Sequence, residues 1–162
     1  MEKPMLKVKN GKLIASNVSF ALPEDFSLDL KTPGGGYHVL EFVSKDEIVK
    51  GGIVYINIEF SNEEMTAKEA MEEFMDDNEL KVKGEFLPVK RGKEALGAFY
   101  TGEGVSFIYD ERYDFPKNRI GHNQVSITIQ LSPMKRRKPK QTIYDVVELP
   151  SVKAFLDSIE YF

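Results

Sequence analysis

The chain has 162 residues, of which 41% are hydrophobic and 30% charged, and a formal net charge of −4. This length predicts a single domain, 1–162, and the composition is typical of a soluble globular protein with a buried core. Because the chain has no cysteine, disulfides, thiolate catalysis and cysteine-containing metal sites are excluded.

The sequence has no apolar run close to the roughly 20 residues that a transmembrane helix needs. Residues 1–10 also lack the apolar stretch of a signal peptide. We therefore expect a cytoplasmic protein if Met1 is the natural start, and an envelope-anchored or secreted protein if a signal segment was trimmed.

The first part of the chain is predicted to consist of short strands and tight turns. Asn10-Gly11 readily takes the positive φ values of a type I′ turn, which predicts a hairpin around this dipeptide. A strand through Val18 and Phe20 and a turn at 23–25 follow. The pattern at 53–60 predicts the strongest strand, because its apolar residues at alternate positions share one face.

A helix is predicted after this strand. Thr66 and Glu69 have the spacing of a capping box, in which both side chains satisfy free backbone N–H groups. The apolar residues that follow recur at helical spacing and form one stripe. They are Ala67, Ala70, Met71, Phe74 and Met75.

Strands separated by turns are predicted again after the helix. In 123–133, apolar and polar residues alternate, which is typical of an antiparallel strand with one buried and one polar outer face. Near the end, Pro150 is predicted to interrupt the chain and Ser151 to cap a last helix. The whole pattern predicts an α+β fold of about seven or eight strands, with one long helix after the fourth or fifth strand and a C-terminal helix.

Two segments resemble the PsbP/Mog-like family, in particular its bacterial branch of small binding proteins. They are the early "VSFALPEDF" strand and turn and the closing "VKAFLDSIEYF". In that family the final helix runs into a short last strand containing a Ser-Ile pair, here Ser158-Ile159. The resemblance implies an αβα sandwich with a central antiparallel β-sheet, and a binding protein without a common catalytic motif.

The candidates for metal chemistry are two histidines and one acidic segment. His38 and His122 lie far apart in the sequence and lack a metal-ligand spacing. Asp110, Glu111 and Asp114 could form a carboxylate cluster for Mg²⁺ or Ca²⁺. The alternative, which we favour, is a strand end at 109–115 whose aromatic residues cover the sheet edge and whose Arg112 neutralises the acids.

Two charged segments are candidate docking surfaces. One is the helix face with Glu69, Glu72, Glu73, Asp76 and Asp77, which is typical of a solvated face and a candidate for a basic partner. The other is a basic run in a loop between two prolines. Its residues are Lys135, Arg136, Arg137, Lys138 and Lys140.

These observations favour a non-enzymatic binding module that takes a protein or peptide and needs no cofactor. A net acidic chain with one local basic run argues against general nucleic-acid binding, because phosphate neutralisation supplies most of that affinity. Two alternatives stay open. One is a metal-assisted hydrolase that uses His122 with Asp110, Glu111 or Asp114, and the other is weak polyanion or anionic-membrane contact through the 135–140 run.

Overall fold

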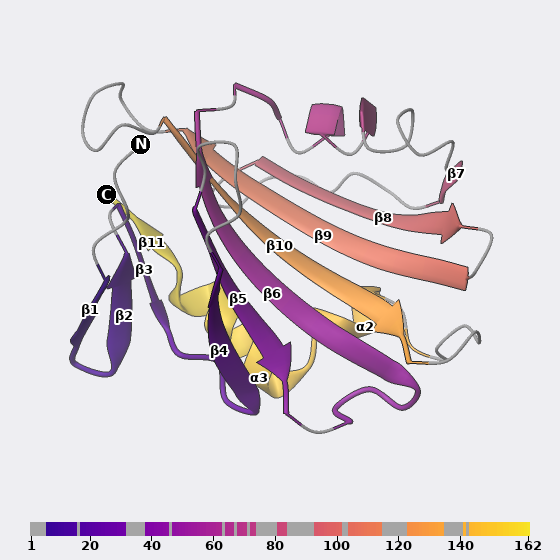
Figure 1. Cartoon of the computed structure of the whole chain (residues 1–162), viewed down its shortest axis with the longest axis horizontal. Coiled ribbons are helices and arrows are strands. Elements are labelled where there is room, and N and C mark those ends of the chain that lie inside the picture. The colour runs from indigo at the N-terminus through magenta and orange to yellow at the C-terminus, as the bar shows by residue number, and fades with distance from the viewer. Residues whose placement is uncertain are drawn as a thin grey trace.

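The computed structural model is an α+β protein with two antiparallel sheets (Figure 1). The structure describes residues 6–15, 17–31, 38–45, 47–62, 64–66, 68–70, 72–73, 81–83, 93–101, 104–114, 123–134, 141 and 143–162. Within this part of the chain, no helix is both long and apolar enough to cross a membrane. The described residues form eleven strands rather than the predicted seven or eight.

The smaller sheet has four strands. In spatial order they are β1 (Leu6–Lys9), β2 (Lys12–Ala15), β3 (Val18–Ala21) and β11 (Glu160–Tyr161). The larger sheet has seven strands. In spatial order they are β4 (Phe26–Lys31), β5 (His38–Ser44), β6 (Gly52–Ser61), β10 (Gln124–Pro133), β9 (Gly104–Asp114), β8 (Lys93–Thr101) and β7 (Lys81–Lys83).

The predicted hairpin is confirmed. β1 and β2 pair antiparallel, with Lys9 opposite Lys12, and only Asn10 and Gly11 connect them. Both connecting residues have positive φ, 53° and 74°, which is the signature of a type I′ turn. The Asn-Gly dipeptide thus determines the position of the turn and the register of the two strands.

The core lies on one face of the seven-stranded sheet. Residues at alternate positions of β6 and β10, such as Ile56 and Ile129, are fully buried, as their pattern predicted. The helices α2 (Ile143–Val146) and α3 (Pro150–Ser158) cover this face (Figure 1). Phe20 of the smaller sheet makes edge-to-face contacts with Phe42 and Phe155, so both sheets share one core with α3.

The predicted helix start at Thr66 is confirmed where the structure describes it. The Thr66 hydroxyl accepts a hydrogen bond from the Glu69 backbone N–H at 3.0 Å. Residues 68–70 and 72–73 are helical. The rest of the predicted apolar stripe, Ala67, Met71, Phe74 and Met75, lies outside the described residues.

The start of the last helix differs from the prediction. Pro150 is the first residue of α3, and Leu149 rather than Ser151 is its N-cap, without a side-chain hydrogen bond. Proline is compatible with this position because the first helical N–H has no partner within the helix. After α3 the chain enters β11, which pairs with β3, so the expected order of helix and short last strand is confirmed. The Ser158-Ile159 pair precedes this strand instead of lying in it, because Ser158 ends α3, Ile159 is its C-cap and β11 begins at Glu160.

A glycine at the start of β6 allows close packing against β10. A Cβ atom at Gly52 would lie 2.6 Å from Leu131 Cδ1, and Leu131 is fully buried. We expect Gly52→Ala to lower the free energy of unfolding by about 1–3 kcal/mol, because a well-packed core resists added volume.

A double-mutant cycle, measured by urea unfolding, checks why Gly52→Ala lowers the free energy of unfolding. Adding Leu131→Val removes the Cδ atoms, so the double variant should lose less stability than the sum of the two single variants. Additive losses would contradict the proposed collision between Gly52→Ala and Leu131.

Candidate functional site

The segment 109–114 is the main concentration of buried polar side chains in the described structure. It belongs to β9, which lies between β10 and β8 inside the seven-stranded sheet. The prediction of a strand end is confirmed, because β9 ends at Asp114, but the predicted position at the sheet edge is wrong, because β9 is an interior strand. Its side chains alternate between the two faces of an interior strand, and both faces are covered.

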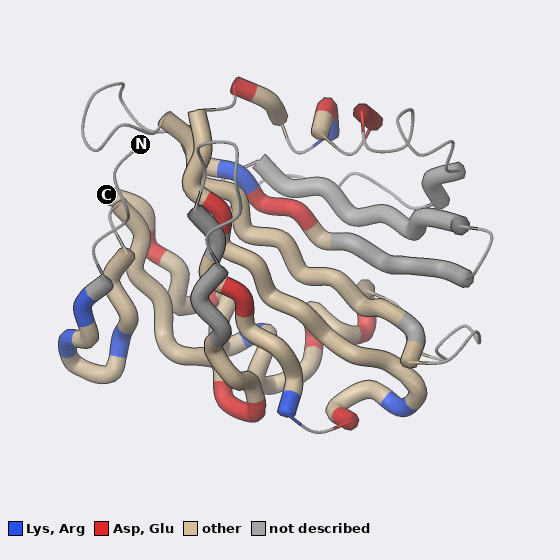
Figure 2. Tube along the Cα trace, in the orientation of Figure 1, with Lys and Arg blue, Asp and Glu red and all other residues tan. Residues whose placement is uncertain are grey.

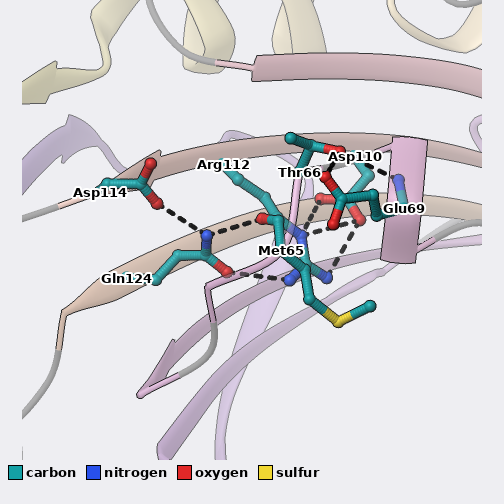
Figure 3. Close-up of polar contacts among 7 residues, drawn as sticks. All are labelled: Met65, Thr66, Glu69, Asp110, Arg112, Asp114 and Gln124. Atoms are coloured by element: carbon teal, nitrogen blue, oxygen red, sulfur yellow. Dashed lines mark hydrogen bonds and ion pairs between the residues drawn. The ribbon is translucent and has the colours of Figure 1, made fainter.

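On the face opposite α2 and α3, Arg112 links an acid and an amide (Figure 3). Its Nε lies 3.3 Å and its Nη2 also 3.3 Å from Asp110 Oδ2. Its Nη1 donates to Gln124 Oε1 at 2.9 Å. The side chains of Arg112 and Asp110 are only 11% and 9% exposed, so this ion pair is largely desolvated.

Gln124 extends this network to a neighbouring segment. Its Nε2 donates to Asp114 Oδ1 and to the backbone carbonyl of Met65, both at 2.8 Å. Since Gln124 is fully buried, its amide needs these partners. The network therefore fixes the chain just before the helical turn at Thr66 to the outer face of the sheet (Figure 3).

Glu111 lies on the opposite face of β9 and belongs to a separate cluster. It is opposite Ile127 of β10, on the apolar core face, and is fully buried. Its Oε1 accepts a hydrogen bond from the Tyr109 hydroxyl at 2.9 Å, and its Oε2 accepts one from the Tyr161 hydroxyl. These two donors satisfy a carboxylate that would otherwise be costly to bury.

Tyr161 connects this carboxylate with the smaller sheet. It lies in β11, and its ring stacks on Tyr113 of β9 with the centroids 4.2 Å apart and the planes at 1°. The backbone N–H of Phe162 donates to the Asn17 carbonyl at 2.9 Å. The Asn17 Nδ2 donates to the Phe162 carbonyl at 2.7 Å. The hydrogen bond to Glu111 and the stacking on Tyr113 therefore hold Tyr161, and with it the end of the chain, against β9.

The residues proposed for metal binding are not brought together. Asp110 and Asp114 lie on one face of β9 and Glu111 lies on the other. The predicted neutralising role of Arg112 is confirmed for Asp110. His38 lies in β5, as predicted, and His122 lies outside the described residues. Among the described residues, no group of three or more His, Asp or Glu side chains is arranged to hold a metal ion.

The charged segments predicted as docking surfaces are described only in part. Lys135, Arg136, Arg137, Lys138 and Lys140 lie outside the described residues, as do Asp76 and Asp77. Glu69, Glu72 and Glu73 are exposed, as expected for a solvated face. Glu72 also forms an i,i+4 ion pair with Lys68 at 3.7 Å.

The structure adds a feature that the sequence did not indicate, namely two sheet edges with exposed strands. β1 ends the smaller sheet and β4 ends the larger one, and no other described strand pairs with their outer sides. Val8 of β1 is 67% exposed and Leu28 of β4 is 42% exposed. Such edges present unpaired backbone groups that can accept an additional strand.

The register shows which backbone groups point outward. Lys9 and Lys12 flank a two-residue turn and form a hydrogen-bonded pair, so the next pair, Val8 and Leu13, is not hydrogen-bonded. The Val8 N–H and C=O therefore point away from β2. In β4, the Lys45 N–H donates to Asp25 at 2.8 Å, and by the same alternation the Leu28 N–H and C=O point outward.

The sequence matches no protein-family model, and comparison with curated proteins and with solved structures gave no significant match.

Proposed function

We propose that this protein is a non-enzymatic binding module whose ligand is a protein or peptide in an extended conformation. The observation that carries this proposal is the pair of open strands, β1 and β4, with outward backbone groups and exposed apolar residues. A ligand strand would gain main-chain hydrogen bonds at such an edge and specificity from alternate side chains.

The hydrogen bonding of the buried polar residues 110–112 and 124 supports a non-enzymatic role. Asp110 is paired with Arg112, Gln124 has three hydrogen-bond partners, and Glu111 accepts from two tyrosines. Fully connected networks of this kind make a fold rigid and specific. The hydrolase alternative would need Asp110 or Asp114 to act without Glu111, since they lie on opposite faces of β9.

We further propose that the fold is the PsbP/Mog-like αβα sandwich, in which one long helix begins near residue 68. Two observations support this arrangement. α2 and α3 cover the apolar face of the larger sheet. Gln124 holds Met65, just before the helical residues 68–70, against the opposite face.

Capture of partners from a native lysate, with variants that block each edge, tests the proposed function. Val8→Pro and Leu28→Pro each remove an outward N–H that no neighbouring strand uses, a position where an edge strand tolerates proline. We expect the wild type and a Lys50→Glu surface control to retain a stoichiometric partner that at least one edge variant loses. Equal recovery by all four proteins, or no partner at all, would contradict strand addition.

A thermal shift assay with Mg²⁺, Ca²⁺ and Zn²⁺ tests the hydrolase alternative. We expect no change in Tm with any of these ions, because Asp110, Glu111 and Asp114 already have partners within the fold. A rise in Tm that Asp114→Asn abolishes would favour the metal-assisted hydrolase instead.

A further inference from the structure

The β1–β2 hairpin carries three lysines in a protein of net negative charge. By the alternation of both strands, the side chains of Lys7, Lys9 and Lys12 lie on one face of the hairpin. The basic positions of this hairpin are blue in Figure 2. Lys7 and Lys9 are exposed, and Lys12 forms an ion pair with Glu160 at 3.6 Å. The whole chain has a net charge of −4, so this patch has the opposite sign to the protein as a whole.

The positions of two of these lysines do not favour the stability of the hairpin. Lys9 lies directly opposite Lys12 in the register. Like charges directly opposite each other destabilise an antiparallel pair. Glu160 already offsets the charge of Lys12, so Lys9 is the member of this pair whose charge an additional anionic group would balance.

We propose that the outer edge of β1 binds an acidic peptide as an additional antiparallel strand. This inference rests on the proposed function and specifies its partner. The peptide residue opposite Val8 would form the hydrogen-bonded pair with the outward Val8 N–H and C=O. Its two neighbours would lie opposite Lys7 and Lys9 in non-hydrogen-bonded pairs, where cross-strand side chains come closest.

The two faces of β1 therefore specify an alternating ligand. On the lysine face, the residues opposite Lys7 and Lys9 would be Asp or Glu. On the other face, the residue opposite Val8 would be apolar, because Val8 is 67% exposed there and its neighbour Leu13 already belongs to the core. The predicted motif is acidic–apolar–acidic.

The same lysines exclude a second copy of the chain from this edge. An antiparallel β1–β1 contact would bring Lys7 and Lys9 of one copy close to the same residues of the other. Lysines on edge strands prevent such association of identical sheets. An acidic strand meets no such repulsion, so the edge discriminates between partners by charge.

Fluorescence anisotropy with two labelled peptides tests the proposal. The probes have the cores Glu-Val-Glu-Val-Glu and Lys-Val-Lys-Val-Lys with identical Gly-Ser flanks. We expect the wild type to bind the acidic probe at least about tenfold more tightly than the basic probe, with affinity falling steeply between about 0.05 M and about 0.5 M salt. Reversing both charges, Lys7→Glu with Lys9→Glu, should invert this preference.

Two further variants separate charge from backbone pairing. The control Lys45→Glu with Lys50→Glu makes the same change in net charge at exposed positions away from β1 and should keep the affinity within about twofold. Val8→Pro keeps both lysines and should lose most of the binding, because the outward donor is gone.

Equal binding of both probes, equal loss in the Lys45/Lys50 control, unchanged binding by Val8→Pro, or no binding at all would each overturn the proposal. The outcomes that reject the acidic ligand of β1 can be distinguished from those that reject the proposed binding module. A partner captured from lysate that depends on Leu28 but not on Lys7 and Lys9 would leave the binding module in place and reject only the acidic ligand of β1.

Discussion

Replacing Arg112 by Leu is expected to lower the free energy of unfolding by about 3–5 kcal/mol, the largest effect that we predict for a single substitution. The reason is the Asp110 carboxylate, whose side chain is only 9% exposed and which would be left without its cation. Gln124 Oε1 would lose its donor in the same variant. Urea unfolding followed by far-UV circular dichroism and tyrosine fluorescence measures the loss, since the chain has no tryptophan.

The double variant Arg112→Met with Asp110→Leu is the matched control. It removes both charges and leaves apolar groups, so most of the lost stability should return, because a buried pair contributes little net stability over apolar residues. A double variant as unstable as Arg112→Leu would contradict this account. So would a loss below about 1 kcal/mol in the single variant, the level of a solvent-exposed pair.

Replacing Glu111 by Leu is expected to cost about 2–4 kcal/mol, because the hydroxyls of Tyr109 and Tyr161 would lose their shared acceptor. This variant should also loosen the end of the chain. Tyr161 lies in β11, which pairs with β3 through only two residue pairs. We therefore expect hydrogen exchange of the β11 and β3 amides to accelerate more than that of β6.

Glu160→Gln provides the control for this prediction. Glu160 lies next to Tyr161 in β11, but its side chain is 70% exposed and paired only with Lys12 among the contacts described above. We expect a change within about 0.5 kcal/mol and unchanged exchange in β3. If Glu160→Gln loosened β11 as much as Glu111→Leu does, the loosening could not be attributed to the loss of the buried Glu111 carboxylate.

Local patterns were sufficient to predict several elements of this fold. The Asn10-Gly11 turn requires two residues that accept positive φ, so its position follows from the dipeptide itself. The alternation in β6 and β10 likewise follows from burial of one sheet face. Thr66 and Glu69 predicted a helix start because capping is an interaction between residues three positions apart.

The interior position of β9 could not be predicted in this way. Strand order depends on pairing between segments far apart in the chain, and charged residues on both faces of a strand are typical of an edge. The partners that make burial possible are distant: Gln124 for Arg112, and Tyr161 for Glu111. The same limit applies to the β1 edge, since Lys7 and Lys9 gain significance only once β1 is known to end a sheet.

Ligands are proposed to bind at the open β1 edge, whereas the charged residues of β9 stabilise the fold. Amide chemical shifts of the isotope-labelled protein, recorded as the acidic probe peptide is added, distinguish these two roles. We predict that the largest changes occur at residues 6–10, with those at 109–114 small. Largest changes within 109–114, or a spectrum that does not respond to the peptide, would contradict the claim.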